Sequence, residues 1–227
     1  MGILKPYRNR THAGKQLALA LHHYARDPGA IVLALPRGGV PVGFAAARAL
    51  GLALDILLVR KLGMPGQEEY ALGAVASGGI RVLLRALIQE AGIAPAALEA
   101  MCARQMAELA VRERRYRGTR AAPALAGHIA ILVDDGLATG ATMLAAIALA
   151  KAGHAARTVV AVPVGAPDTC AQLEHVVDEV ICPLRPPVFR AVGQWYRQFD
   201  QTSDEEVIDL LARAWREQVP RRDAIHP

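Results

Sequence analysis

The segment 129–142, with the sequence IAILVDDGLATGAT, constrains the fold of this chain more than any other stretch. Its first five residues are apolar, as in a strand that is buried inside a parallel sheet. Asp134 and Asp135 follow, and a loop of small residues then leads into an alanine-rich helix. Because open α/β sheets bind their ligands at the carboxyl ends of the strands, this segment predicts a binding site on such a sheet.

The loop after the two aspartates has the composition of a phosphate-binding site. Thr139 and Thr142 supply hydroxyl groups, and the unpaired N–H groups at the start of the following helix favour an anion. The loop lacks the lysine of the nucleoside-triphosphate P-loop, so it is not a loop of that type. Because carboxylates would repel the phosphate, Asp134 and Asp135 are expected to face ribose hydroxyls, a hydrated Mg²⁺ ion, or both. The alternative is a turn that only caps a helix, which requires this combination of residues to arise by chance.

Two more strands are predicted to end at the same edge of the sheet. Residues 31–35 lead into the loop PRGGVPVG, where glycines let the backbone approach a ligand closely. A second strand, 54–59, ends in Arg60 and Lys61. In isolation, the first motif would fit a tight turn and the second a solvated pair of charges. Because both meet the loop of segment 129–142, we expect the basic side chains to face a diphosphate.

Length and composition limit the class of protein. The 227 residues suit one α/β domain, 1–227. No apolar run is long enough to span a bilayer, the first ten residues lack the apolar part of a signal peptide, and the three cysteines show no metal or disulfide spacing. These features predict a cytoplasmic protein. The net charge of +5 comes with only 4% aromatic residues, which favours a phosphate-rich small substrate over a nucleic acid.

The rest of the chain alternates between predicted strands and helices. Further strands are expected at 159–164 and 176–182, which together with the earlier strands favours a doubly wound, mainly parallel sheet with right-handed crossovers. A long helix is expected at 94–116. Its basic end is interpreted as a solvated face rather than a phosphate clamp, because cations stabilise a helix C-terminus in any case; it contains Arg112, Arg114, Arg115 and Arg117.

Taken together, these motifs resemble the type I phosphoribosyltransferases, and in particular a bacterial stand-alone group whose substrate is largely unassigned. The likeness covers nearly all of the chain and includes LPRGGVPVG, VRKLG, ALGAVASGG, DDGLATGAT and VGxWYxxFxQTSDEEV. It implies an α/β, doubly wound, mainly parallel sheet with a mobile lid at about 66–79 and a helical insertion at about 94–117. It also implies a small hood that, with the C-terminal helix, covers about 183–219, and a strained non-proline peptide near Arg37 and Gly38.

The resemblance implies a pentosyltransferase of nucleotide metabolism. Such an enzyme transfers the 5-phosphoribosyl group of phosphoribosyl diphosphate (PRPP) to a nitrogen acceptor, in the first instance a nucleobase, and releases diphosphate. The implied cofactor is Mg²⁺, held by Asp134 and Asp135 directly or through water. The implied partners are PRPP and a small acceptor rather than a nucleic acid or a membrane, and a homodimer is compatible with them. The implied site residues are Asp134, Asp135, Lys61 and Glu69 for catalysis; Gly136, Leu137, Ala138, Thr139, Gly140, Ala141 and Thr142 for the phosphate; Arg37, Gly38, Gly39, Arg60 and Lys61 for the diphosphate; and Trp195 and Tyr196 for the acceptor.

Some parts of this interpretation stay open. Ala138 stands where the hypoxanthine-guanine enzymes carry an acid, which argues against a 6-oxopurine acceptor that uses that acid. Glu69 is the candidate acid or base, although a solvated glutamate fits equally well, and the aromatic residues after 188 would also fit a core. A non-catalytic regulator that senses PRPP or a nucleotide is the main alternative, but no helix-turn-helix fits the N-terminal region. A Rossmann oxidoreductase is disfavoured because GxGxxG is absent after every strand.

Overall fold

A five-stranded parallel sheet forms the centre of the computed structural model, which describes residues 5–64, 67–76 and 79–218. The strand order is β2-β1-β6-β7-β8, so the chain starts near the middle, runs to one edge and then crosses to the other side. Ala34 lies opposite both Ile56 and Val133, and Val133 lies opposite Ala161, so the strands end in line. This arrangement confirms the doubly wound α/β fold. The strands are β1 (Ala30–Ala34), β2 (Ala53–Ile56), β6 (Ile129–Val133), β7 (Arg157–Ala161) and β8 (Glu179–Ile181).

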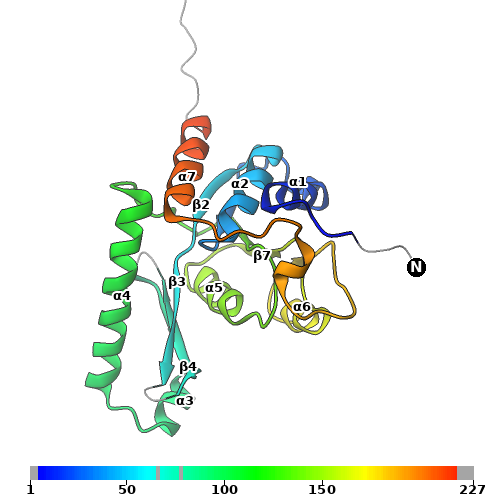
Figure 1. Ribbon diagram of the computed structural model, residues 1–227. Coiled ribbons are helices and arrows are strands. Elements are labelled where there is room, and N and C mark those ends of the chain that lie inside the picture. Colours follow the sequence, from blue (N-terminus) through cyan, green and yellow to red (C-terminus); the bar gives the residue numbers. More distant parts are fainter. Residues whose placement is uncertain (1–4, 65–66, 77–78, 219–227) are drawn as a thin grey trace, which may run out of the picture.

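Helices cover both faces of this sheet (Figure 1). Val32 and Ala34 pack into the apolar cluster under α1, α2 and α7, whereas Leu33 packs into the cluster under α5 and α6. Successive residues of one strand are therefore buried on opposite faces, which is why the strands are continuous apolar runs in the sequence. The helices are α1 (Arg10–Ala20), α2 (Gly39–Leu50), α5 (Ala141–Ala152), α6 (Pro167–Glu174) and α7 (Asp204–Gln218).

A second, antiparallel sheet extends from the central domain together with two helices (Figure 1). The predicted strand 54–59 is wrong in its extent, because β2 ends at Ile56 and a new strand begins at Val59. Leu57 and Leu58, which join the two sheets, are as buried as the strands, so the apolar pattern does not mark the junction. The predicted lid, 66–79, contains a strand that the sequence reasoning did not predict. The elements are β3 (Val59–Met64), β4 (Gln67–Ala76), β5 (Arg81–Leu83), α3 (Arg85–Glu90) and α4 (Pro95–Arg117).

The long helix expected at 94–116 is confirmed as α4, but part of its basic end is not a solvated face. The side chain of Arg117 is only 1% exposed. Its Nε donates to Asp55 Oδ1 over 2.8 Å, its Nη2 donates to the carbonyl of Ile56 over 2.5 Å, and its Nη1 pairs with Glu113. Burial raises the pKa of Asp55, and the charge of Arg117 opposes that shift. Arg117 therefore anchors the end of α4 to the end of β2.

No helix in the described ranges is both long enough and apolar enough to cross a membrane.

Candidate active site

Two loops meet at the carboxyl edge of the central sheet, as the sequence predicts. Asp134 and Asp135 follow β6, and the loop after β1 lies directly against them. A Cβ atom on Gly38 would lie 2.1 Å from Asp135 Oδ2, and one on Gly39 would lie 2.6 Å from the carbonyl oxygen of Val133. Only glycine fits these two positions without a shift of the neighbouring loop.

A cis peptide bond joins Pro36 to Arg37 in the loop after β1. The sequence reasoning expected the unusual peptide near Arg37 and Gly38, so the prediction of the loop is correct and the bond lies one residue earlier.

The two aspartates differ in their partners. Asp135 Oδ2 accepts hydrogen bonds from Arg10 Nε over 2.9 Å and pairs with Arg10 Nη2 at 2.8 Å. Asp134 Oδ1 accepts from the backbone N–H of Asp135 over 2.8 Å. Burial raises the pKa of Asp134, and the neighbouring charge of Asp135 raises it further. Burial also raises the pKa of Asp135, whereas Arg10 lowers it. If both carboxyl groups were ionised, their negative charge would exceed what Arg10 compensates.

A divalent cation fits this carboxylate pair. Carboxylate oxygens are the ligands that Mg²⁺ prefers, and a cation beside them would favour the ionised form of both groups. Within residues 5–64, 67–76 and 79–218, no cluster of three or more His, Cys, Asp or Glu residues could hold a metal alone. Asp134 and Asp135 could therefore hold the ion only together with oxygen atoms of water or of a substrate.

The loop 136–142 is fixed at one end and has unpaired amides at the other. The N–H of Leu137 donates to the carbonyl of Val164 over 2.9 Å, and the Thr169 hydroxyl donates to the carbonyl of Ala138 over 2.6 Å. In the described part of the chain, the amides of residues 138–142 donate no hydrogen bond to a protein oxygen. The side chains of Thr139 and Thr142 are exposed. The start of α5 thus presents several free donors, which is the arrangement that binds a phosphate.

A cavity of about 480 Å³ lies beside this loop, and the predicted basic pair, Arg60 and Lys61, lines it. Arg60 and Lys61 lie inside β3 rather than at the end of a central strand, but they still line the same cavity as Thr142. The sequence reasoning missed the residues that α4 contributes to this cavity, which include two more arginines. The lining residues are Pro36, Val59, Arg60, Lys61, Leu62, Gly63, Met101, Arg104, Gln105, Arg112 and Thr142.

Arg60 is held by an ion pair, and one of its buried N–H donors has no partner among the described residues. Its Nη2 pairs with Glu108 of α4 at 2.7 Å. Its Nε is buried and has no hydrogen-bond partner among the described residues. Because an unpaired buried donor is costly, this atom suggests a ligand oxygen. One face of α4 meets β3 and consists of residues at helical spacing, namely 101, 104, 105, 108 and 112. The sequence therefore predicts this face, but it does not predict that β3 packs against it.

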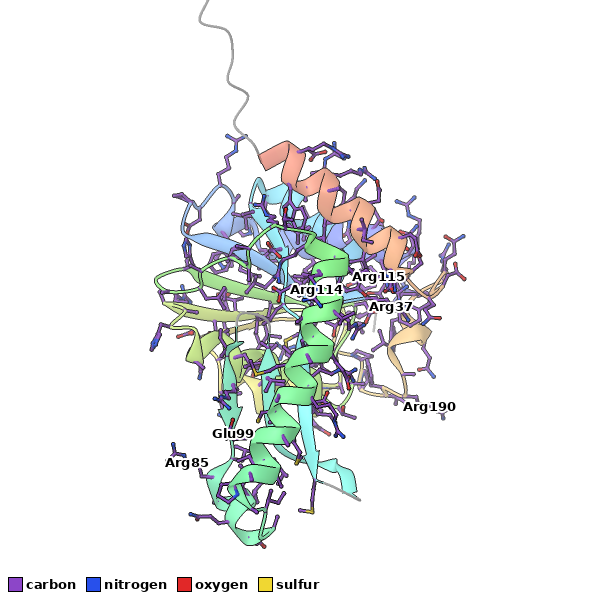
Figure 2. The ribbon with its side chains drawn as sticks, turned by 90° about the vertical axis from the view of Figure 1, so that its left-hand side faces the viewer. Arg37, Arg85, Glu99, Arg114, Arg115 and Arg190 are labelled. Atoms are coloured by element: carbon purple, nitrogen blue, oxygen red, sulfur yellow. The ribbon has the colours of Figure 1, made fainter. Side chains whose placement is uncertain are left out.

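Arg37 is held away from this cavity. Its Nη1 lies 3.7 Å from Asp204 Oδ1 at the start of α7, and Asp204 also pairs with Arg115 Nη1 at 2.6 Å. Figure 2 shows Arg37 and Arg115 close together between the end of α4 and the start of α7. Arg37 is not among the residues that line the cavity, so its contact with a diphosphate stays a prediction.

Part of the segment predicted as the hood lies directly against Asp135. The Tyr196 side chain is buried, and its hydroxyl donates to the backbone carbonyl of Asp135 over 2.5 Å. Burial raises the pKa of Tyr196, and the charge of Asp135 adds to the shift. Trp195 is partly buried, and its Nε1 has no hydrogen-bond partner among the described residues. Tyr196 is therefore placed to support Asp135, whereas Trp195 keeps a donor that a ligand could use.

Glu69 belongs to β4, but its side chain lies outside the described part of the structure, as does that of Tyr70. Its role as an acid or base stays a prediction.

Comparisons with known proteins agree on one family. The family model described as "Phosphoribosyl transferase domain" matches residues 4–199. "Putative phosphoribosyl transferase Rv0571c" from Mycobacterium tuberculosis (strain ATCC 25618 / H37Rv) is 45% identical over 214 residues, which are 94% of this chain and 48% of that protein. This chain therefore spans about half the length of the curated relatives that it matches. The crystal structure of TT1426 from Thermus thermophilus is 42% identical with a TM-score of 0.82, and the match covers 92% of this chain and 98% of that one.

Proposed function

Because this chain belongs to the phosphoribosyl transferase domain family, we propose that it transfers the 5-phosphoribosyl group of PRPP to a nitrogen acceptor and releases diphosphate. One observation carries the proposal. The carboxylate pair, the free amides of residues 138–142 and the cavity with Arg60 and Lys61 lie at one edge of the sheet. They offer separate sites for the sugar, the 5-phosphate and the diphosphate of one molecule.

Different residues would bind different parts of PRPP. The amides of residues 138–142 and the Thr142 hydroxyl would bind the 5-phosphate, and Asp134 would accept from a ribose hydroxyl. Arg60, Lys61 and Arg112 would bind the diphosphate, on which negative charge grows as it leaves the anomeric carbon. Fixed positive charge in a cavity stabilises that developing charge without reorganisation, so positioning and electrostatics would supply most of the catalysis.

We propose Mg²⁺ as the cofactor, held by Asp134 and Asp135 with the remaining ligands from substrate and water. When bound, Mg²⁺ supplies further neutralisation of the diphosphate. The support from this chain is the raised pKa of both carboxyl groups, which a divalent cation would reverse. Arg10 would then keep Asp135 oriented, because it contacts one oxygen, Oδ2, and leaves the other available.

We propose a nucleobase as the acceptor and Trp195 as a residue that binds it. Trp195→Phe is expected to raise the KM of the acceptor severalfold, because stacking is kept while the Nε1 donor is lost, and to leave the Kd for PRPP unchanged. Trp215→Phe is the matched control, since Trp215 lies on α7, away from the site, and its Nε1 donates to the carbonyl of Leu54 on β2. If Trp195→Phe lowers the Tm with acceptor kinetics intact, Trp195 belongs to the core and the acceptor binds elsewhere.

The segment 66–79 remains our proposed lid. Strand β4 lies between β3, which carries Arg60 and Lys61, and β5, so closure would move a hairpin rather than an irregular loop. Limited proteolysis within 66–79 is expected to slow when PRPP and Mg²⁺ are added together, since closing lids exclude water from a reaction. Equal cleavage rates with and without the ligands would rule out a closing lid.

The direct test of the proposed function is a screen for diphosphate release. Nucleobases and small amines are incubated with PRPP, Mg²⁺ and the protein, and the inorganic diphosphate is measured. The proposal predicts that one acceptor class increases the release well above the rate without acceptor, and that Arg60→Gln suppresses it while Arg85→Gln does not. Arg85 is exposed on α3 at the far end of the extension (Figure 2). Binding of PRPP without release for any acceptor would favour a sensor.

A further inference from the structure

A second cavity, of about 540 Å³, lies between the start of α1 and residues 197–198, which follow the 3-10 turn at Trp195. Three of its lining residues are the cations Arg8, Lys15 and Arg197, and a fourth is His12. No lining residue is acidic, and none of the three cations forms an ion pair within the part of the chain that the structure describes. No residue of the loop 134–142 lines this cavity, so it is separate from the proposed active site.

The pKa of His12 reflects the positive charge in this cavity. Its pKa is lowered first by burial and then by the charges of Arg8, Lys15 and Arg197. The ring of Tyr7 lies 6.0 Å away, and the backbone N–H of Arg8 donates to His12 Nδ1 over 3.3 Å. Among the described residues, no acidic group contributes to the pKa shift of His12. An anion in the cavity would relieve the mutual repulsion of the cations.

We propose that this cavity binds a phosphorylated small molecule, with the phosphate between Arg8, Lys15 and Arg197. Two guanidinium groups and one ammonium group suit the several oxygens and the double charge of a phosphate better than a single carboxylate. The volume falls within the range of small-molecule sites, which is about 300–1,000 Å³. Asn9 and Gln198 add polar groups for the rest of the ligand.

The two walls of the cavity are the two segments that hold Asp135. They are joined to each other by the hydrogen bonds from Arg197 N to the Tyr7 carbonyl, 2.8 Å, and from Gln198 N to the Arg8 carbonyl, 3.0 Å. Arg10 on one wall pairs with Asp135, and Tyr196 on the other donates to the Asp135 backbone. A ligand that contacts Arg8 and Arg197 together therefore bridges the segments that position this aspartate.

The test is an NMR titration of the histidine side chains with inorganic phosphate and with a nucleoside 5′-monophosphate, at constant ionic strength. A nearby anion favours the protonated imidazole, so the His12 pKa is expected to rise by about 0.5–1 unit and to saturate. The ring resonances of His22 and His23 should not respond to either ligand. Arg197→Gln is expected to weaken binding about tenfold, whereas Arg190→Gln, an exposed hood arginine away from the cavity (Figure 2), should leave it unchanged. A stronger response to the nucleotide than to phosphate identifies a ligand with a nucleoside part.

Three outcomes would overturn the proposal. Chloride at equal ionic strength could shift the His12 pKa equally, which would show screening rather than a site. A single-stranded oligonucleotide could displace the nucleotide at a far lower phosphate concentration, which would show a polymer surface. The response could also vanish in Asp134→Asn, which would place the anion in the active site. Persistence of the response in that variant separates this inference from the proposed function.

Discussion

Asp134→Asn is expected to lower kcat/KM for PRPP by about 100-fold or more and, at the same time, to stabilise the empty protein at pH 8. The loss of rate follows from the removal of an electrostatic contact near the reacting sugar, which typically costs about 10²–10³ in rate. The gain in stability follows from the raised pKa of this carboxyl group. An asparagine at position 134 can still accept the hydrogen bond from the backbone N–H of Asp135, but it does not bury a negative charge.

The pH dependence gives the direction of the stability change. Because the folded pKa of Asp134 is raised above its unfolded value of 3.8, the folded protein binds this proton more tightly. The free energy of unfolding should therefore fall as pH rises from about 4 to the raised pKa, and the variant should lose most of that fall. We therefore expect the variant to be more stable than the wild type at pH 8, and this gain to shrink as the pH falls toward 4.

Urea unfolding between pH 5 and pH 8.5 measures this effect. Asp209→Asn is the matched control, because Asp209 lies on α7 with a 62% exposed side chain. The control should keep the pH dependence of the wild type. An Asp134→Asn protein with unchanged kcat/KM, or with the wild-type dependence on pH, would contradict this account of the carboxylate pair.

Arg117→Met is expected to cost about 3–5 kcal/mol of the free energy of unfolding, because it removes one partner of a buried ion pair and leaves the charge of Asp55 uncompensated. Arg114→Met is the matched control on the same helix and should change the free energy by less than about 0.5 kcal/mol, since Arg114 is exposed. Asp55→Asn added to Arg117→Met should recover part of the loss. Equal, small effects of Arg114→Met and Arg117→Met would mean that Arg117 does not anchor α4.

The central site was predictable because its signal is local. Segment 129–142 contains its own strand, acids, loop and helix start, so a single stretch of sequence describes the geometry found at the end of β6. The loop after β1 was predictable for the same reason. For these two loops, the structure adds the close contact of Gly38 and Gly39 with the segment that contains the aspartates.

The remaining parts of the site depend on contacts between distant segments. Arg10 is 125 residues from Asp135, and nothing near it in the sequence indicates a carboxylate partner. Arg112 and Arg117 lie five residues apart on one helix, yet the first lines the cavity and the second is buried against the end of β2. Their different environments come from the packing of α4, which helical periodicity alone does not determine. Arg60 and Lys61 lie beside the loop 136–142 as predicted, but they belong to a different strand from the predicted one, because buried Leu57 and Leu58 hide the change from one sheet to the other.

Thermal unfolding with PRPP and Mg²⁺ tests the central claim most directly, namely that the edge after β6 binds PRPP. At a PRPP concentration about one hundred times its Kd, the wild-type protein should gain roughly 2.7 kcal/mol of stability, and far less without Mg²⁺. The double variant Asp134→Asn and Asp135→Asn should lose most of this gain, while Asp209→Asn keeps it. Equal stabilisation of the wild type and the double variant by PRPP and Mg²⁺ would contradict the claim.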